Sequence, residues 1–236
     1  MSEQTLNNRL RGIHVPFPTP FGADGEVDAR AVRENIARWN ETGISGYVAL
    51  GSTGERVHLD ERERLTVVEA AREVVSKSMA FIVGIGEQDT RRTIRDAALA
   101  ARAGADAVLV MTPHFYRGRM TPAALVKHFT SVADASPVPI ILYNIPQNTG
   151  VALTPETIAR LGEHENICGI KDSSGDVATL METLHLAGGA PERFRIMTGH
   201  AGVLYPSLCA GVSGAVLAAA CVVPQLCVEV FEAVAA

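Results

Sequence analysis

The chain repeats one unit eight times: a short apolar run rich in valine and isoleucine, then a stretch with apolar residues at helical spacing. The runs lack a strict polar–apolar alternation, which is typical of parallel strands buried on both faces. We expect strands at residues 12–17, 46–50, 81–85, 107–111, 139–143, 166–171, 194–198 and 214–220. We expect helices at about residues 28–39, 60–76, 90–103, 121–135, 154–161, 177–186 and 224–236.

Eight strand–helix units predict an α/β fold, and its closed form is a (β/α)8 TIM barrel with its site at the carboxyl ends of the strands. A doubly wound open sheet is the alternative, but the Gly-x-Gly-x-x-Gly turn of that fold is absent after the first run. We expect a polar N-terminal arm at residues 1–11 and one barrel domain at residues 12–236. Only one helix length follows the eighth run, so we expect little or no C-terminal helical extension. In the helix at 60–76, Leu65, Val68 and Ala71 are expected to share the buried side.

The charge and cysteine content exclude several classes of protein. A net charge of -5 without a basic block argues against a nucleic-acid or membrane-surface partner. No apolar run reaches membrane-spanning length, and the N-terminus lacks a signal-peptide core. The cysteines lie in or beside apolar segments without a C-x-x-C pair: Cys168, Cys209, Cys221 and Cys227. We therefore expect reduced core cysteines in a cytoplasmic protein.

Lys171 ends the sixth apolar run and is followed by small polar residues. At such a strand end its amine would lie in a half-dry pocket. Because desolvation disfavours the ammonium form, the amine could be partly neutral near pH 7 and attack a carbonyl group. A lysine that extends its charged end into solvent is the commoner structural alternative.

Two other strand ends carry polar groups that suit the same chemistry. The second run ends in a turn at 51–55 in which glycines let successive amides converge on an anion, while Ser52 and Thr53 offer hydroxyls. The fifth run ends at Tyr143, a phenol expected at the barrel mouth beside Lys171. An ordinary turn and a rim aromatic are the structural alternatives. A lysine, a phenol and an amide–hydroxyl turn on three strand ends together favour an active site.

A metal site and a phosphate site are the other chemistries to weigh. The histidines show no His-x-His or His-x-x-x-His pair, so we expect no metal and disfavour a zinc aldolase. Glycine-rich turns at residues 198–202 and 211–214 flank the eighth run, where barrels often hold phosphate. A phosphosugar-binding barrel stays open, although neither turn contains a lysine or arginine.

Three motifs together carry a family resemblance: Gly-Ser-Thr-Gly-Glu at 51–55, Tyr-Asn-Ile-Pro-x-x-Thr-Gly at 143–150 and Gly-Ile-Lys-Asp-Ser at 169–173. They resemble the dihydrodipicolinate synthase/N-acetylneuraminate lyase family of class I pyruvate aldolases, from Gly12 to about Pro224. The resemblance implies a (β/α)8 barrel, a Schiff-base lysine and a homo-oligomer, a tetramer or a dimer. Most family members carry further C-terminal helices beyond the barrel.

The resemblance also implies roles for particular residues. Lys171 matches the Schiff-base lysine, Tyr143 the acid–base phenol, and Ser52 the first member of a proton relay. Ser52 and Thr53, with Gly51, match the turn that binds the pyruvate carboxylate. Val216 in the eighth run is a further candidate for substrate contact.

Two departures from the synthase pattern bear on the substrate. Phe115 stands where the synthase has a relay tyrosine that acts across a subunit interface, and Tyr116 follows it directly. We count both among the candidate substrate-binding residues. Asn148 stands where the synthase has an arginine for the carboxylate of aspartate semialdehyde.

Asn148 and the segments 112–120 and 134–137 most resemble the 4-hydroxy-2-oxoglutarate aldolases, which yield pyruvate and glyoxylate. We therefore expect a lyase that acts on a small 2-oxo acid through an imine on Lys171, without a separate cofactor. Three alternatives stay open: 4-hydroxy-tetrahydrodipicolinate synthase, an aldolase or dehydratase for 2-keto-3-deoxy sugar acids, and a barrel that binds 2-oxo acids as a sensor.

Overall fold

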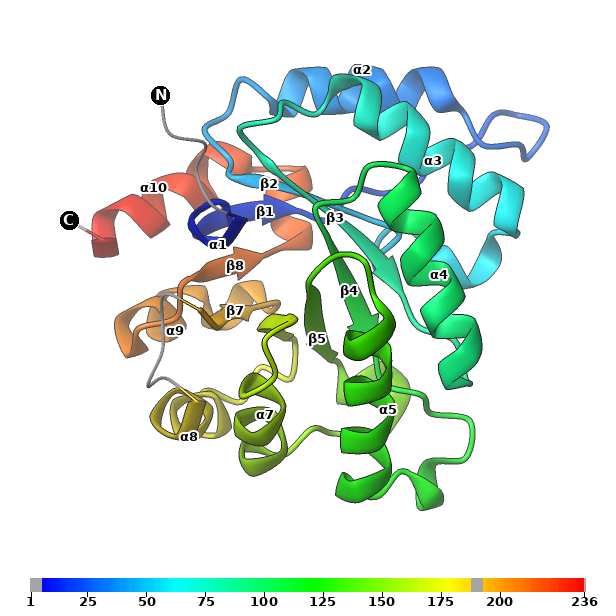
Figure 1. Ribbon diagram of the computed structural model, residues 1–236. Helices are drawn as coiled ribbons and strands as arrows, with labels where there is room; N and C mark the ends of the chain where they lie inside the picture. The colour runs from blue at the N-terminus through cyan, green and yellow to red at the C-terminus, as the bar shows by residue number, and fades with distance from the viewer. Residues whose placement is uncertain (1–5, 188–192, 236) are drawn as a thin grey trace.

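The strands form one closed parallel barrel. The computed structural model describes residues 6–187 and 193–235. Within these ranges eight parallel strands pair in chain order, and the last pairs with the first (Figure 1). The strands are β1 Gly12–Val15, β2 Gly46–Ala49, β3 Ala80–Ile85, β4 Ala107–Met111, β5 Ile140–Asn144, β6 Ile167–Asp172, β7 Arg195–Thr198 and β8 Gly214–Val216. The predicted (β/α)8 TIM barrel is confirmed.

Helices surround this barrel and connect successive strands (Figure 1). The α-helices are α1 Leu6–Arg9, α2 Ala29–Trp39, α3 Glu61–Val74, α4 Thr90–Arg102, α5 Pro122–Ala135, α6 Pro146–Thr149, α7 Pro155–Gly162, α8 Val177–Ala187, α9 Leu204–Ala210 and α10 Pro224–Ala235. Short 3-10 helices are η1 Arg56–His58, η2 Arg117–Arg119, η3 Ala201–Val203 and η4 Ala218–Cys221. Most long helices begin where a side-chain oxygen accepts a backbone N–H, at Asp28, Asp60, Asp89, Thr121 and Thr154.

Two apolar layers hold the barrel together. The larger lies between the strands and the helices, and the smaller fills the barrel interior with side chains such as Leu109, Ile141 and Met197. Leu10 belongs to this inner cluster and is fully buried. The described part of the N-terminal arm therefore packs against the barrel through Leu10 and Leu6 of α1.

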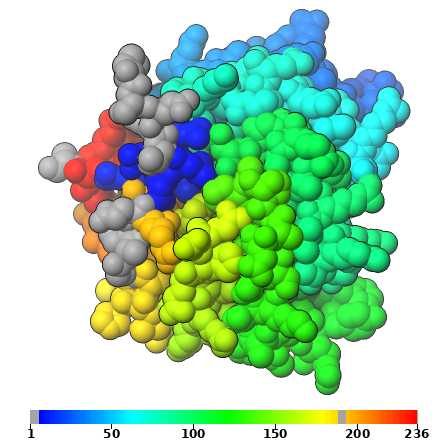
Figure 2. Space-filling view, in the orientation of Figure 1, coloured from blue at the N-terminus to red at the C-terminus, as the bar shows by residue number. Residues whose placement is uncertain are grey.

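Glycines allow the first and last strands to meet. β1 and β8 pair at Gly12 and Gly214, and a Cβ atom added at Gly214 would collide with the backbone of Gly12. α10 packs against β1, so segments from the two ends of the chain lie side by side (Figures 1 and 2). Closure brings all eight strand ends to one mouth.

Four sequence expectations are corrected. β8 ends at Val216 rather than residue 220, because the chain turns into η4 with the Ala220 amide bonded to the Leu217 carbonyl. Leu65 is 41% exposed, unlike Val68 and Ala71, because it lies at the edge of the α3 stripe. The structure also adds α6 and α9, which the helix pattern did not indicate.

The fourth correction concerns the cysteines. Cys209 is exposed on the short helix α9, whereas Cys227 is buried and Cys168 and Cys221 are half-buried. All four are free thiols.

No helix among the described residues is long and apolar enough to cross a membrane.

We predict that Gly214→Ala destabilises the fold by about 1–3 kcal/mol, since a methyl group has to be forced between β1 and β8. The matched control is Gly118→Ala in η2, where a Cβ atom meets nothing within 4 Å. Urea unfolding of both variants measures the difference. Equal stability of the two variants would contradict the closure argument.

Candidate active site

Lys171 and Tyr143 face each other at adjacent strand ends. They occupy the same register position of β6 and β5, which places both side chains on the same side of the sheet. The Lys171 Nζ atom donates to the Tyr143 hydroxyl at 3.4 Å and lies 4.4 Å from the centre of its ring. Only 4% of the Lys171 surface is exposed. The alternative of a lysine extended into solvent is therefore wrong.

Burial changes the protonation of this amine. It lowers the pKa of Lys171 from the usual 10.5, because the ammonium form loses its hydration, while the Tyr143 phenol acts in the opposite direction. Burial dominates, so a larger fraction of the amine is neutral near pH 7 than in an exposed lysine. The protonation state suits a nucleophile.

The Asp172 carboxylate, next in sequence to Lys171, is turned away from the amine. Its Oδ2 atom accepts from the Asn144 side-chain amide at 2.6 Å, and its Oδ1 atom accepts from the Ser174 amide at 2.9 Å. Asn144 Oδ1 in turn accepts from the Leu153 amide at 3.0 Å. This clamp fixes the ends of β5 and β6 on either side of the Lys171–Tyr143 pair. The sequence analysis missed it, although Asn144 and Asp172 directly follow the two residues that it singled out.

The turn at residues 51–55 brings Ser52 to the same phenol. Ser52 Oγ and the Tyr143 hydroxyl share a hydrogen bond of 3.2 Å, so Ser52, Tyr143 and Lys171 form one chain of polar groups. The turn is bracketed by Leu50 and Glu55, whose φ angles are 56° and 55°. Each left-handed residue with a side chain costs about 1–2 kcal/mol. Such strain persists only where surrounding contacts hold the backbone.

A cavity of about 300 Å³ opens at these strand ends. Its lining residues are Pro16, Ser52, Thr53, Tyr143, Ile145, Gln147, Asn148, Lys171, Ser173, Gly199, His200, Val216 and Ala218. A neighbouring cavity of about 270 Å³ shares Ser52, Tyr143 and Asn148 and extends past Gly51 toward the ends of β3 and β4. The structure thus brings together seven of the nine predicted site residues: Lys171, Tyr143, Ser52, Thr53, Gly51, Asn148 and Val216.

The two aromatic candidates from the β4–α5 loop lie elsewhere. Phe115 and Tyr116 are 72% and 69% exposed, contact each other edge to face at 5.0 Å, and line neither cavity. Their loop is held by Gln88, whose Oε1 atom accepts from the His114 and Phe115 amides at 2.9 and 2.8 Å. The structure therefore does not bring these two side chains together with the other seven candidates.

Seven residues that line the Lys171 cavity were not among the candidates of the sequence analysis: Pro16, Ile145, Gln147, Ser173, Gly199, His200 and Ala218. Gly199 follows β7, and a Cβ atom there would lie 2.9 Å from Lys171 Cε, so the amine needs a glycine at this point. The His200 ring lies against Gly175 and Gly202. The signal for both residues was the glycine-rich turn after the seventh run, which we had assigned only to a possible phosphate site.

Among the described residues, no three His, Cys, Asp or Glu side chains gather as a metal site would require.

Comparison with known proteins identifies the family. A sequence model of the dihydrodipicolinate synthetase family matches residues 9–236. The chain belongs to this family. A family member named 4-hydroxy-tetrahydrodipicolinate synthase, from Methanothrix thermoacetophila, is 37% identical over 95% of the chain and 74% of its own length. Another, from Emericella nidulans, is named a probable mitochondrial 4-hydroxy-2-oxoglutarate aldolase and is 36% identical over 94% of the chain and 72% of its own length.

Solved structures of the family have the same barrel. YagE, an E. coli K12 prophage protein solved in complex with pyruvate, superposes with a TM-score of 0.90 at 33% identity, over 95% of this chain and 75% of its own. The pyruvate complex of the dihydrodipicolinate synthase from Acinetobacter baumannii also gives a TM-score of 0.90, at 31% identity over 96% and 76% of the two chains. The family consists of lyases, so the chain is an aldolase-type lyase of the dihydrodipicolinate synthetase family.

We predict that burial makes Lys171 titrate below the usual 10.5, and the exposed Lys77 and Lys127 serve as internal references. Tyr143→Phe will lower the pKa of Lys171 further, because the phenol acts to raise that pKa in the parent. Competitive acetylation with trace acetic anhydride across a pH series, read by peptide mass spectrometry, measures all three amines at once. A Lys171 midpoint equal to that of Lys127, or unchanged by Tyr143→Phe, would contradict the assignment.

Proposed function

We propose that the protein is a class I aldolase that forms an imine between Lys171 and a 2-oxo acid and makes or breaks a C–C bond with pyruvate as one component. The observation that carries this proposal is the buried Lys171 amine, 3.4 Å from the Tyr143 hydroxyl, which in turn lies 3.2 Å from Ser52 Oγ. A desolvated amine, a phenol and a hydroxyl in contact are the groups that imine chemistry requires.

The proposed reaction proceeds in balanced steps. The neutral Lys171 amine adds to C2 of the 2-oxo acid, and loss of water gives an iminium ion. Tyr143 gives its proton to the departing water in that step, and the resulting phenolate accepts the proton of the C4 hydroxyl as the C3–C4 bond breaks; the bonding electrons move into the iminium to leave an enamine and an aldehyde. Protonation of the enamine at C3 and hydrolysis then release pyruvate and regenerate the amine. The iminium is the electron sink, so the proposal includes no metal or organic cofactor.

The 51–55 turn is proposed to bind the substrate carboxylate. Ser52 and Thr53 line the cavity beside Lys171, and their hydroxyls with the turn amides can donate to an anion. Binding there would orient C2 toward the amine, and orientation supplies much of the rate of such reactions.

For the substrate we propose 4-hydroxy-2-oxoglutarate, which the reaction would split into pyruvate and glyoxylate. Asn148 lines both cavities, whereas the described residues that line the Lys171 cavity include no arginine. An amide binds a carboxylate less strongly than a guanidinium does. The likeness to the Emericella aldolase agrees with this choice.

The second candidate is 4-hydroxy-tetrahydrodipicolinate synthase, the name of the Methanothrix relative and of related bacterial proteins. One structural observation favours it: the exposed Arg117 side chain reaches Gly150, two residues after Asn148, with Nη1 3.1 Å from the place of a Cβ atom. Arg117 could thus supply the guanidinium that residue 148 lacks. Turnover of either substrate would exclude the sensor alternative.

We further propose a cytoplasmic homo-oligomer, as the family resemblance implies. A solved relative that is 31% identical is described as the first monomeric variant of a dihydrodipicolinate synthase, which is consistent with assembly in other members.

We predict that pyruvate with borohydride adds one reduced pyruvyl group, at Lys171. Lys171→Ala will not be labelled, and neither will Lys171→Arg, because a guanidinium keeps its proton and cannot attack. The matched control is Lys127→Arg, which changes an exposed lysine on α5 and should label like the parent. Intact-mass and peptide mass spectrometry read the result; label on the Lys171→Ala variant would refute the imine assignment.

We predict that kcat/KM for cleavage of 4-hydroxy-2-oxoglutarate exceeds that for condensation of pyruvate with aspartate semialdehyde. Asn148→Arg should shift the ratio of the two values by about tenfold or more toward condensation, because it restores a charge-assisted contact. Asn148→Gln is the matched control, since it lengthens the side chain without adding charge. A parent enzyme that prefers aspartate semialdehyde would make the synthase the better assignment.

A further inference from the structure

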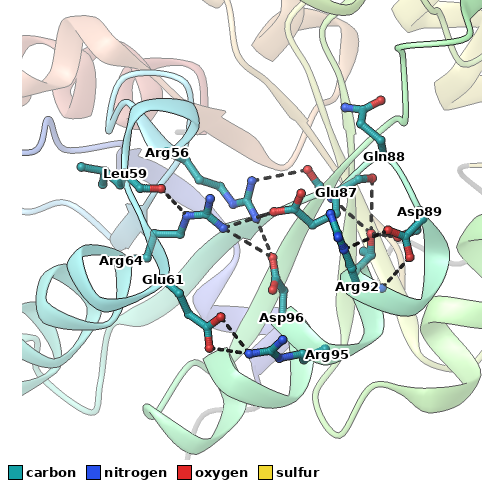
Figure 3. Close-up of polar contacts among 12 residues, drawn as sticks. Arg56, Leu59, Glu61, Arg64, Glu87, Gln88, Asp89, Arg92, Arg95 and Asp96 are labelled. Atoms are coloured by element: carbon teal, nitrogen blue, oxygen red, sulfur yellow. Dashed lines mark hydrogen bonds and ion pairs between the residues drawn. The ribbon is translucent and has the colours of Figure 1, made fainter.

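A group of four charged side chains lies directly behind the 51–55 turn (Figure 3). Arg56, the first residue of η1, donates through Nη2 to Glu87 Oε1 at 2.7 Å and to Asp96 Oδ2 at 2.6 Å. Its Nη1 atom donates to the Gly86 carbonyl at 3.4 Å. Arg64 on α3 is the fourth member and contacts Glu87 Oε1 at 3.2 Å.

Arg56 is the member that connects this group to the candidate active site. Its side chain is 10% exposed, against 26% for Arg64, and it lines the cavity that also contains Ser52 and Tyr143. Because two guanidinium groups face two carboxylates, the group has no net charge and adds little field at the site. Its effect there is therefore mechanical.

We propose that Arg56 is a positioning residue, which ties the 51–55 turn to Glu87 and Asp96 and so holds Ser52 and Thr53 where they receive the carboxylate of the 2-oxo acid. This inference rests on the proposed function. Arg56 follows Glu55, which with Leu50 is one of the two left-handed residues that bracket the turn. A strained turn relaxes unless it is held on both sides. The backbone of Leu50 rests on Gly84 on one side, and Arg56 supplies the anchor on the other.

The anchor extends to the next loop along the barrel. Glu87 belongs to the β3–α4 loop, and its neighbour Gln88 accepts the His114 and Phe115 amides of the β4–α5 loop. Three successive loops at the mouth are thus joined through Arg56, Glu87 and Gln88.

The two carboxylates differ in their pKa. Burial raises the pKa of Asp96. Burial also acts to raise the pKa of Glu87, but Arg56 and Arg64 outweigh burial there, so the pKa of Glu87 is lowered.

The test compares Arg56→Met with Arg64→Met. Both remove a guanidinium from the same two carboxylates, but only Arg56 is attached to the turn. We expect Arg56→Met to raise the pyruvate concentration for half-maximal borohydride trapping by roughly 10- to 100-fold, with a much smaller change in the saturating rate. Arg64→Met should leave both quantities close to the parent values.

A double variant tests whether a loss of pyruvate affinity in Arg56→Met comes only from a folding defect. Arg56→Met combined with Asp96→Asn removes a buried carboxylate that the single change leaves poorly paired. It should restore the thermal midpoint without restoring pyruvate affinity. Amide hydrogen exchange at residues 52–55 should quicken in both Arg56 variants and stay slow in Arg64→Met. Arg56→Lys keeps the charge and should recover part of the affinity.

The outcomes separate this inference from the proposed function. A parent protein that pyruvate and borohydride do not label overturns the proposed function and this inference with it. A parent that is labelled, together with an Arg56→Met variant of unchanged pyruvate dependence and unchanged exchange, overturns the inference alone. Equal effects of Arg56→Met and Arg64→Met would also overturn it, because the effect would then come from the charge and not from the turn.

Discussion

The pairing of β1 with β8 is the constraint on which the rest of the molecule depends. An open sheet of eight strands would spread its carboxyl ends over a long edge, whereas closure gathers them around one mouth. The contact of Gly12 with Gly214 allows the two strands to approach as closely as any other pair. Ser52 and Tyr143, 91 positions apart in sequence, come within hydrogen-bonding distance because of it.

The order of strands accounts for most of what the sequence could predict. Adjacent parallel strands place their last residues side by side, so Tyr143 and Lys171 could be paired from their places at the ends of two consecutive runs. The turn at residues 51–55 could be added because its glycines and hydroxyls are contiguous. Local patterns thus sufficed for residues whose neighbours are set by the fold class.

What could not be predicted depends on side chains that meet across loops. Gln88 holds the backbone of the loop that carries Phe115, and no pattern links a residue after β3 to one after β4. Arg56 has no role in the sequence analysis, because the carboxylates that bind it lie 31 and 40 positions away. The early end of β8 has a different origin in the backbone, since the Ala220 amide bonds to the Leu217 carbonyl and turns the chain into η4.

Arg56 and Lys171 are two buried basic side chains at the barrel mouth, and they have opposite roles. Arg56 cannot lose its proton, so its burial requires two carboxylates, and the result is a rigid anchor. Lys171 can lose its proton, so its burial without a carboxylate partner lowers its pKa and leaves a nucleophile. A carboxylate beside Lys171 would stabilise the ammonium and suppress the amine. The Asn144 amide therefore has a consequence beyond packing, because it holds the carboxylate of Asp172, which follows Lys171, on the far side of the strand end.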